Sequence, residues 1–226
     1  LLLDSFYLNV NIETQDRAAL MTAMSISGQS LFCSSKGVPI VMFDTKNNYA
    51  VEGINAIGLT IATNQVFSCT IDHQFQTALG ATNPCGFSIS TAPTDVTISP
   101  NASGSLLNYV FGLGDVEIAA ASESTLEAVS LRDDVFLGRL IMDANNSNKN
   151  LIQVKSIKVD GIELLSAVTP QTTPTLLSQF TPDCNDKTGL QLNYVVKQNS
   201  IVSITLANVD PANPIKVAGG FYCKAL

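Results

Sequence analysis

Charged residues are scarce in this sequence. Asp, Glu, Lys and Arg together make up 14% of the 226 residues, whereas hydrophobic residues make up 46%. An ordinary soluble domain has roughly 25% charged residues, and surface charge keeps soluble proteins apart from one another. We therefore expect partners to cover much of the surface. The alternative is a secreted domain whose surface is polar but neutral.

Basic residues are few and dispersed. The sequence has 12 Lys and Arg against 19 Asp and Glu, and its three arginines are Arg17, Arg132 and Arg139. Nucleic-acid binding needs a basic stripe that neutralises phosphates, so we expect no direct nucleic-acid binding. No apolar run reaches the roughly 20 residues that cross a bilayer, so we expect no membrane-spanning segment.

Histidine-based catalysis is restricted to one position, because His73 is the only histidine. No G-x-S-x-G motif supplies a nucleophile for it. Zinc-ligand pairs with the usual spacing and glycine-rich phosphate loops are also missing from the sequence. We therefore expect no enzyme, no catalytic residue, no cofactor and no metal site.

One enzymatic alternative rests on the acidic residues between Asp115 and Asp143, which include Glu123 and Asp134. Glycoside hydrolases place a pair of carboxylates on either side of the scissile bond. A glycoside hydrolase-like enzyme that uses these carboxylates is thus a second alternative. The sequence has no Trp to form an aromatic sugar platform.

The five cysteines are scattered without C-x-x-C spacing, at Cys33, Cys69, Cys85, Cys184 and Cys223. An odd number leaves at least one free thiol. Buried thiols pack as small hydrophobic groups, which is the structural interpretation of this scatter. In an oxidising compartment, Cys69 and Cys85 are candidates for a disulfide.

Short β-type runs recur along the whole sequence, roughly 12–14 of them at intervals of about 10–16 residues. They predict an all-β protein, an antiparallel β-sandwich of jelly-roll or Greek-key type. One or two short helices are also predicted. Asp16–Met24 is rich in helix formers, although it also fits a strand, and Ser124–Leu131 begins with a capping box of Ser124 and Glu127.

The clearest strand pattern lies near the C-terminus. Leu190–Val196 and Ile201–Leu206 flank a polar turn and predict a hairpin, and Ile215–Cys223 predicts a third strand. Free sheet edges are usually guarded by charge, and this stretch has little. We therefore expect Ile215–Tyr222 to be a central strand or to be covered by a neighbouring subunit.

A second hairpin is predicted between Val135–Met142 and Leu151–Val159, which flank a polar turn. Asp160-Gly161 follows directly and is a strong signal for a two-residue hairpin turn.

The domain organisation has two interpretations. Residues 1–226 form a single β-sandwich unit, or a linker over residues 93–105 separates a first sandwich (1–92) from a second (106–226). The linker candidate is rich in Pro, Ser, Asn and Gly. A short similarity between residues 54–59 and 154–159 suggests that the two sandwiches would be related.

In its many short strands, its Pro/Thr/Asn-rich loops and its low charge, the chain resembles the jelly-roll coat proteins of icosahedral viruses and phages. The resemblance implies a structural protein of the virion capsid that assembles with copies of itself and with other structural proteins. It departs from one common coat design because it lacks a basic N-terminal arm. The alternative is a secreted or surface-displayed binding module, an adhesin or carbohydrate-binding domain, which would be extracellular.

For a self-assembling protein, the function lies in the subunit interfaces. Aromatic and apolar residues near the chain ends are the interface candidates: Phe6, Tyr7, Phe221, Tyr222 and Leu226. The alternative is that these side chains fill the core.

Overall fold

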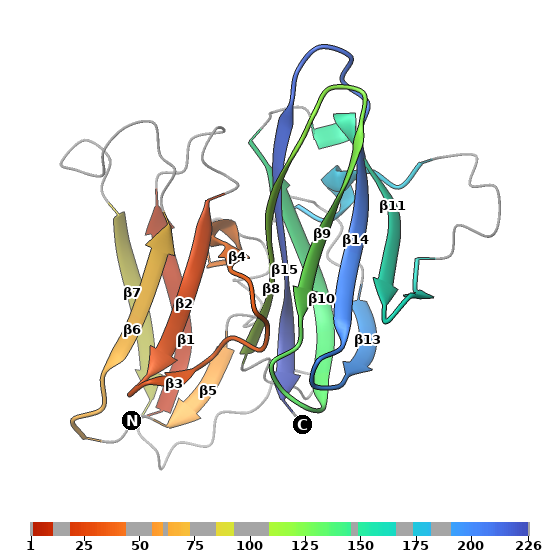
Figure 1. Cartoon of the computed structure of the whole chain (residues 1–226). Coiled ribbons are helices and arrows are strands. Elements are labelled where there is room, and N and C mark those ends of the chain that lie inside the picture. Colours follow the sequence, from red (N-terminus) through yellow and green to blue (C-terminus); the bar gives the residue numbers. More distant parts are fainter. Residues whose placement is uncertain are drawn as a thin grey trace.

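The described part of the chain consists mostly of antiparallel β-strands (Figure 1). The computed structural model describes residues 2–10, 19–43, 56–60, 63–72, 85–92, 109–145, 149–165, 174–181 and 191–225. In this part of the chain the only helical elements are short 3-10 turns, at Ile40–Phe43 (η2), Lys149–Leu151 (η4) and Leu177–Gln179 (η5). The predicted all-β sandwich class is confirmed, whereas the predicted short helices are not found among the described residues.

Two four-stranded sheets contain the eight strands that the structure describes after residue 108. The inner sheet has the order β13 (Gln191–Val196), β10 (Val135–Ala144), β15 (Ile215–Ala225), β8 (Tyr109–Ile118). The outer sheet has the order β12 (Ile162–Glu163), β11 (Ile152–Val159), β14 (Ile201–Asn208), β9 (Glu123–Val129).

The strand pairing within this sandwich is nested. The first strand pairs with the last (β8 with β15), the second with the seventh (β9 with β14), the third with the sixth (β10 with β13) and the fourth with the fifth (β11 with β12). The chain is therefore one long antiparallel ribbon with its tip at the β11–β12 turn. Pairing of β10 with β15 and of β11 with β14 joins successive parts of the ribbon side by side.

The strands before residue 93 form two smaller sheets. One has the order β5 (Ala56–Thr60), β1 (Leu2–Val10), β7 (Cys85–Ala92), of which only the backbone is described. In the other, β2 (Leu20–Ile26) pairs with β3 (Gln29–Ser30), β4 (Val38–Pro39) and β6 (Phe67–Asp72). Figure 1 shows these sheets on one side of the sandwich.

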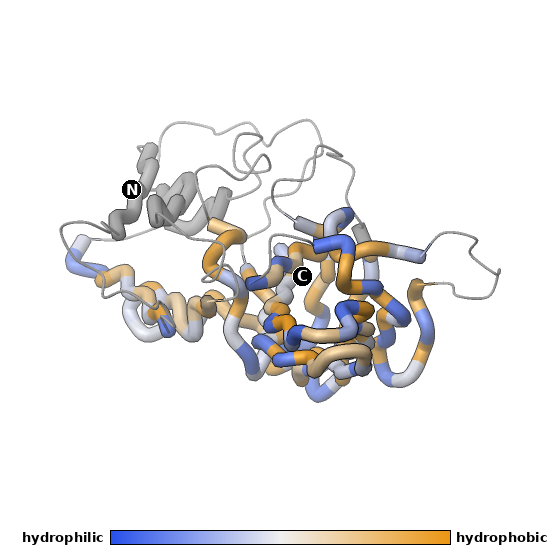
Figure 2. Tube along the Cα trace, turned by 90° about the horizontal axis from the view of Figure 1, so that it is seen from above, coloured by the Kyte–Doolittle hydropathy of each residue, from blue (hydrophilic) through white to orange (hydrophobic). Residues whose placement is uncertain are grey.

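The main core fills the space between the inner and outer sheets. In the outer sheet, inward apolar residues alternate with more polar outward residues, and Figure 2 shows alternating hydropathy along much of the tube. Fully buried members include Phe111, Leu137, Ile157, Val202 and Phe221. The Phe111 and Phe221 rings meet edge to face, with centroids 6.3 Å apart, in one of the preferred geometries of aromatic pairs.

A second core covers the other face of the inner sheet. From the inner sheet it takes Val110, Ile141 and Tyr222, and from the N-terminal part it takes residues such as Met21 and Met42. The Tyr222 hydroxyl donates a hydrogen bond to the carbonyl of Met42. Strand β15 is thus buried on both faces and lies between two other strands, so the central-strand prediction for Ile215–Tyr222 is confirmed.

The predicted helix over Ser124–Leu131 is wrong, because this segment contains β9. Leu126 and Ala128 point into the core while Thr125 and Glu127 are exposed, which is the alternation of a strand. The local capping signal is outweighed by pairing with β14 and by burial on one face. Likewise, the described part of Asp16–Met24 forms strand β2.

Both predicted hairpins have correct strands but wrong partners. Strands β13 and β14 lie in different sheets, and so do β10 and β11. Their polar turns are arches that carry the chain from one sheet to the other. The Asp160-Gly161 hairpin turn is confirmed: Val159 is opposite Ile162, and both turn residues have positive φ, 49° and 81°.

The loop before β15 is held by a side-chain network. Asn208, which is 2% exposed, donates to the carbonyls of Ile118 and Asn213 at 3.2 and 2.8 Å. Asp210 accepts bonds from the backbone N–H groups of Ala212 and Asn213 at 2.8 and 3.1 Å. These donors stabilise the charged carboxylate, and the bond from Ala212 is the main cause of the lowered pKa of Asp210.

We expect the hydrogen bonds to the Asp210 carboxylate to make the stability of the protein depend on pH in the acidic range. Because the folded pKa of Asp210 lies below its ordinary value of 3.8, the stabilisation is present above that pH and is lost as the pH falls through the folded pKa. We expect the free energy of unfolding to fall less steeply with decreasing pH below about 4 in Asp210→Asn than in the wild type. Urea unfolding at a series of pH values measures this, and identical slopes would contradict it.

The domain division stays a prediction. Residues 56–59 and 154–159 do not occupy equivalent places, since β5 is an edge strand and β11 lies inside its sheet. Within the residues that the structure describes, no helix is long and apolar enough to cross a membrane.

Candidate functional site

Residues Leu31–Gly37, here called the edge segment, cover one edge of the sandwich. The N–H of Cys33 donates to the carbonyl of Val110 on β8 at 2.8 Å, and the N–H of Val110 donates to the carbonyl of Leu31 at 3.1 Å. On the other sheet, the N–H of Ser35 donates to the carbonyl of Val129 on β9 at 3.1 Å. One segment thus satisfies backbone groups at the edges of both sheets, which would otherwise be free to pair with another chain.

The edge segment approaches β8 unusually closely, and a glycine makes this possible. A Cβ atom on Gly112 would lie 2.1 Å from the carbonyl oxygen of Gly37 and 2.2 Å from that of Lys36. The N–H of Gly112 donates to the Ser34 hydroxyl at 2.6 Å, and the N–H of Gly114 donates to the carbonyl of Gly37 at 2.9 Å. Backbone therefore packs on backbone here, with no room for a side chain.

A cleft of about 760 Å³ lies beside the edge segment, between β2 and the edges of β8 and β9. Its lining is mixed, with Phe32 and the exposed Leu131 next to Lys36, Asp115 and Glu127. A cleft of this volume is large enough for a small molecule. Its charged side chains come from three segments: Lys36 from the edge segment, Asp115 from β8 and Glu127 from β9.

Arg132 connects the edge region to the sandwich. Its guanidinium lies 4.7 Å from the centre of the Tyr109 ring and donates to the carbonyl of Ser30 at 2.8 Å. We expect Arg132→Met, which keeps the apolar stem, to lower the free energy of unfolding by about 1–2 kcal/mol, from the loss of the cation–π contact and the charged hydrogen bond. Chemical denaturation measures this, and a change below 0.3 kcal/mol would exclude a stabilising role for the guanidinium.

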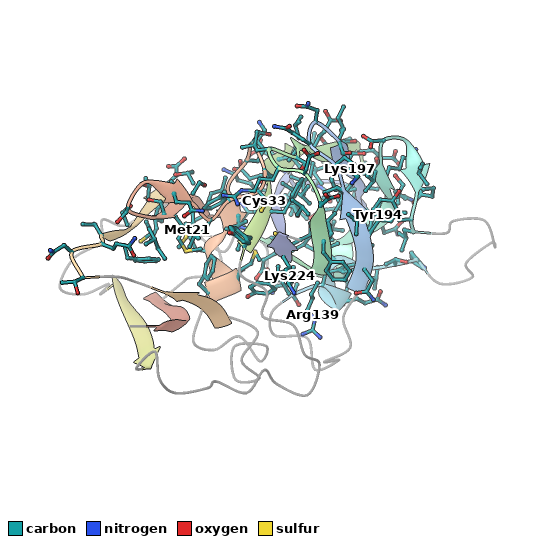
Figure 3. All side chains as sticks on the ribbon, turned by 90° about the horizontal axis from the view of Figure 1, so that it is seen from below. Met21, Cys33, Arg139, Tyr194, Lys197 and Lys224 are labelled. Atoms are coloured by element: carbon teal, nitrogen blue, oxygen red, sulfur yellow. The ribbon has the colours of Figure 1, made fainter. Side chains whose placement is uncertain are left out.

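Two thiols lie in the main core next to this region. Cys33 and Cys223 are both fully buried and free, and Figure 3 shows Cys33 between the strands that carry Met21 and Tyr194. Burial raises the pKa of Cys223 well above its ordinary value. A side-chain hydrogen bond with Cys223 instead lowers the pKa of Cys33. Both buried side chains contribute to the main core as small hydrophobic groups, as the sequence predicted for the cysteines. The Cys69 thiol is not part of a disulfide in the structure, so the predicted Cys69–Cys85 disulfide is not formed.

The interface candidates near the chain ends fall into two groups. Some are buried in the cores, and the side chains of the others lie outside the described part of the chain. Phe221 and Tyr222 are 0% and 2% exposed and fill the two cores, which favours the core alternative for both. The backbone of Phe6 and Tyr7 belongs to β1, but their side chains lie outside the described part, as does Leu226. His73 also lies outside it.

Three of the acidic residues of the hydrolase alternative form ion pairs within the fold. Three ion pairs are Asp115 with Lys216, Asp134 with Lys197, and Asp143 with Lys149. The bond from Lys197 to Asp134 raises the pKa of that lysine. Asp143 is fully buried, and its distance to the Lys149 Nζ is 2.9 Å.

Glu123 and Glu127 point outward from β9, four residues apart. Four residues of strand span about 13 Å, which exceeds the separation of roughly 5–9.5 Å between glycosidase carboxylates. The described residues contain no group of three or more His, Cys, Asp or Glu side chains placed to hold a metal ion. The geometry therefore offers no carboxylate pair of the expected kind at these positions.

The edge segment and Gly112 are features that the sequence did not predict. Leu31–Gly37 shows no alternation and pairs only through isolated bridges, at Phe32, Ser34 and Lys36. Comparisons with protein-family models, with curated proteins and with solved structures found no match. The arguments about function therefore rest on the geometry of this chain.

Proposed function

We propose that this chain is a structural protein that assembles with copies of itself, as a component of a virion capsid. The observation that supports the proposal most is the nested strand pairing, in which a ribbon of eight strands is rolled into two facing sheets. Eight strands in this order are typical of a jelly roll, a fold found in viral capsid proteins, lectins and cupins. A shared fold supports a function only by analogy. The interior and the outer surface of the sandwich must therefore distinguish among these classes of protein.

The packed interior argues against a cupin-like role. Cupins use the inside of the barrel for chemistry, and here apolar side chains such as Leu113, Leu140 and Leu206 fill the space between the sheets. What the sandwich offers to partners is therefore its outer surface.

The outer sheet supports a role in assembly. Its exposed face carries mainly Ser, Thr and isolated charges, and Ile201 at one end of β14 is 42% exposed. The central strands of the inner sheet, β10 and β15, are already covered on both faces by the two cores. A sheet face on which acidic and basic residues balance suits contact with another protein better than it suits repulsion of neighbours.

Electron microscopy of the native source material tests the proposal. We expect the chain in a regular shell, and we expect the purified protein to form oligomers in size-exclusion chromatography with light scattering. A strictly monomeric species at several hundred micromolar would overturn the proposal.

The cleft beside the edge segment supports a second candidate, a binding module. Its polar lining of Ser, Thr, Lys, Asp and Glu side chains fits a small polar ligand such as a sugar. A glycan array distinguishes the two: saturable binding by monomeric protein that is lost in Glu127→Ala would favour this candidate over assembly.

A further inference from the structure

We infer that two copies of this chain pack the exposed faces of their outer sheets against each other across a twofold axis that runs along β14. The inference rests on the proposed function and names one of its interfaces. The observation behind it is the distribution of charge on this face. Acidic side chains lie on one side of β14 and basic side chains on the other, so the faces of two copies can be electrostatically complementary.

Acidic and basic residues lie on opposite sides of β14. In register, Ser203 on β14 is opposite Glu127 on β9 and opposite Lys158 on β11. These three residues form one row across the sheet, and Figure 1 shows the three strands side by side. The exposed Glu123 adds a second acid on β9, and the exposed Lys155 adds a second lysine on β11.

These four charges have no ion-pair partner among the described residues. Adjacent strands lie about 4.8 Å apart, so β14 separates the acidic from the basic side by roughly 10 Å. A neutral row of Ser203 and Thr205 lies between them, with the Thr205 hydroxyl 3.3 Å from that of Thr125. The charges are therefore available to a partner.

One neighbouring acid is already engaged. Glu163 on β12 is opposite Lys158, but its Oε1 accepts hydrogen bonds from the N–H groups of Ile157 and Leu165, both at 3.0 Å. Glu163 thus stabilises the β11–β12 turn and leaves the ammonium group of Lys158 for an outside carboxylate.

A twofold axis along β14 brings unlike charges together. Rotation by 180° about this axis exchanges the two sides of the sheet and keeps each row at its own height. Glu127 of one copy then faces Lys158 of the other, and the reciprocal pair forms at the same time. An axis perpendicular to the strands would instead place β9 on β9 and bring like charges together, so the charge pattern selects one arrangement.

The size of the face predicts a weak contact. Three strands of about seven residues present roughly 15 Å by 23 Å, which is less than the 800 Å² per partner of a standard interface. Ile201, on the same face, would add an apolar contact between the copies. Weak pairwise contacts gain strength when each subunit has several of them, as in a shell.

The test is charge reversal followed by complementation in the full-length protein. We expect Glu127→Lys and Lys158→Glu each to raise the dissociation constant of self-association at least tenfold, because each places two like-charged pairs across the axis. An equimolar mixture of the two variants restores both attractive pairs and should recover wild-type association, as should the double variant. Sedimentation velocity up to several hundred micromolar measures this.

The matched control is Glu117→Lys, a charge reversal at an exposed position on β8 of the other sheet, which should leave association unchanged. Circular dichroism checks that every variant is folded. If the wild type associates and the folded reversal variants associate equally well, or if their mixture fails to recover, the inferred face is wrong while self-assembly stands. A wild type that stays monomeric overturns both.

Discussion

Replacing Val217 with aspartate will unfold the protein rather than only prevent its assembly. Val217 is fully buried in the main core of a single chain, where it lies in register with Ala144 on one side and Val116 on the other. A carboxylate there has no partner and no access to water. We expect a loss of more than about 4 kcal/mol, which is most of the stability of an ordinary domain.

The measurement is the free energy of unfolding by chemical denaturation, with near-ultraviolet circular dichroism as a check on tertiary packing. Val209→Asp is the matched control, because Val209 is 43% exposed in the loop after β14. We expect that variant to stay within about 0.5 kcal/mol of the wild type. A folded Val217→Asp monomer that has lost only the ability to associate would show that β15 is covered by a neighbour and not by its own sheets.

The strands could be predicted because burial on one face leaves a period of two in the sequence. In β14, Val202, Ile204 and Leu206 point into the core and alternate with Ser203 and Thr205, and this pattern is visible without a structure. The same pattern does not specify which strand is the neighbour. A polar turn of four residues connects two strands of a hairpin and two strands in facing sheets equally well.

Strand β9 shows that a local sequence signal can also predict the wrong secondary structure. Its capping box of Ser124 and Glu127 predicts a helix when only local signals are considered. Its burial alternates because β14 is beside it, and β14 is more than 70 residues away in the sequence. Long-range pairing decided the structure of this segment, and no local signal contained that information.

Aromatic residues near the chain ends are interface candidates from the sequence alone, because interfaces are enriched in aromatic side chains. Phe221 and Tyr222 lie near the end of the sequence but in the middle of a central strand, so they are among the most deeply buried residues. The charges that divide the outer face could be placed only after the register of β9, β14 and β11 was known. Glu127 and Lys158 are 31 residues apart, and nothing local relates them.

Gly112 is the position where adding a single methyl group should have the largest effect. The Cβ of alanine would lie 2.1 Å and 2.2 Å from two backbone oxygens of the edge segment, and a backbone cannot move aside by changing rotamer. Strand β8 and the edge segment must separate, and the bonds from Gly112 to Ser34 and from Gly114 to Gly37 are then lost. We expect Gly112→Ala to lower the free energy of unfolding by about 3–4 kcal/mol.

Gly28→Ala is the control for the loss of a glycine without a clash, since no atom lies within 4 Å of its added Cβ although its φ is 82°. We expect that variant to lose only about 1 kcal/mol.

Cys33 reports on the edge segment directly, because its thiol is fully buried as long as the segment is in place. In Gly112→Ala we expect Cys33 to react with a thiol reagent at least tenfold faster than in the wild type under native conditions, as followed by peptide mass spectrometry. Cys223 is equally buried but belongs to the central strand β15, so its reactivity should rise less.

Wild-type stability together with unchanged labelling of Cys33 would show that the edge segment does not depend on the close approach at Gly112. Faster labelling of Cys33 alone would show instead that the edge segment separates locally while the sandwich stays folded.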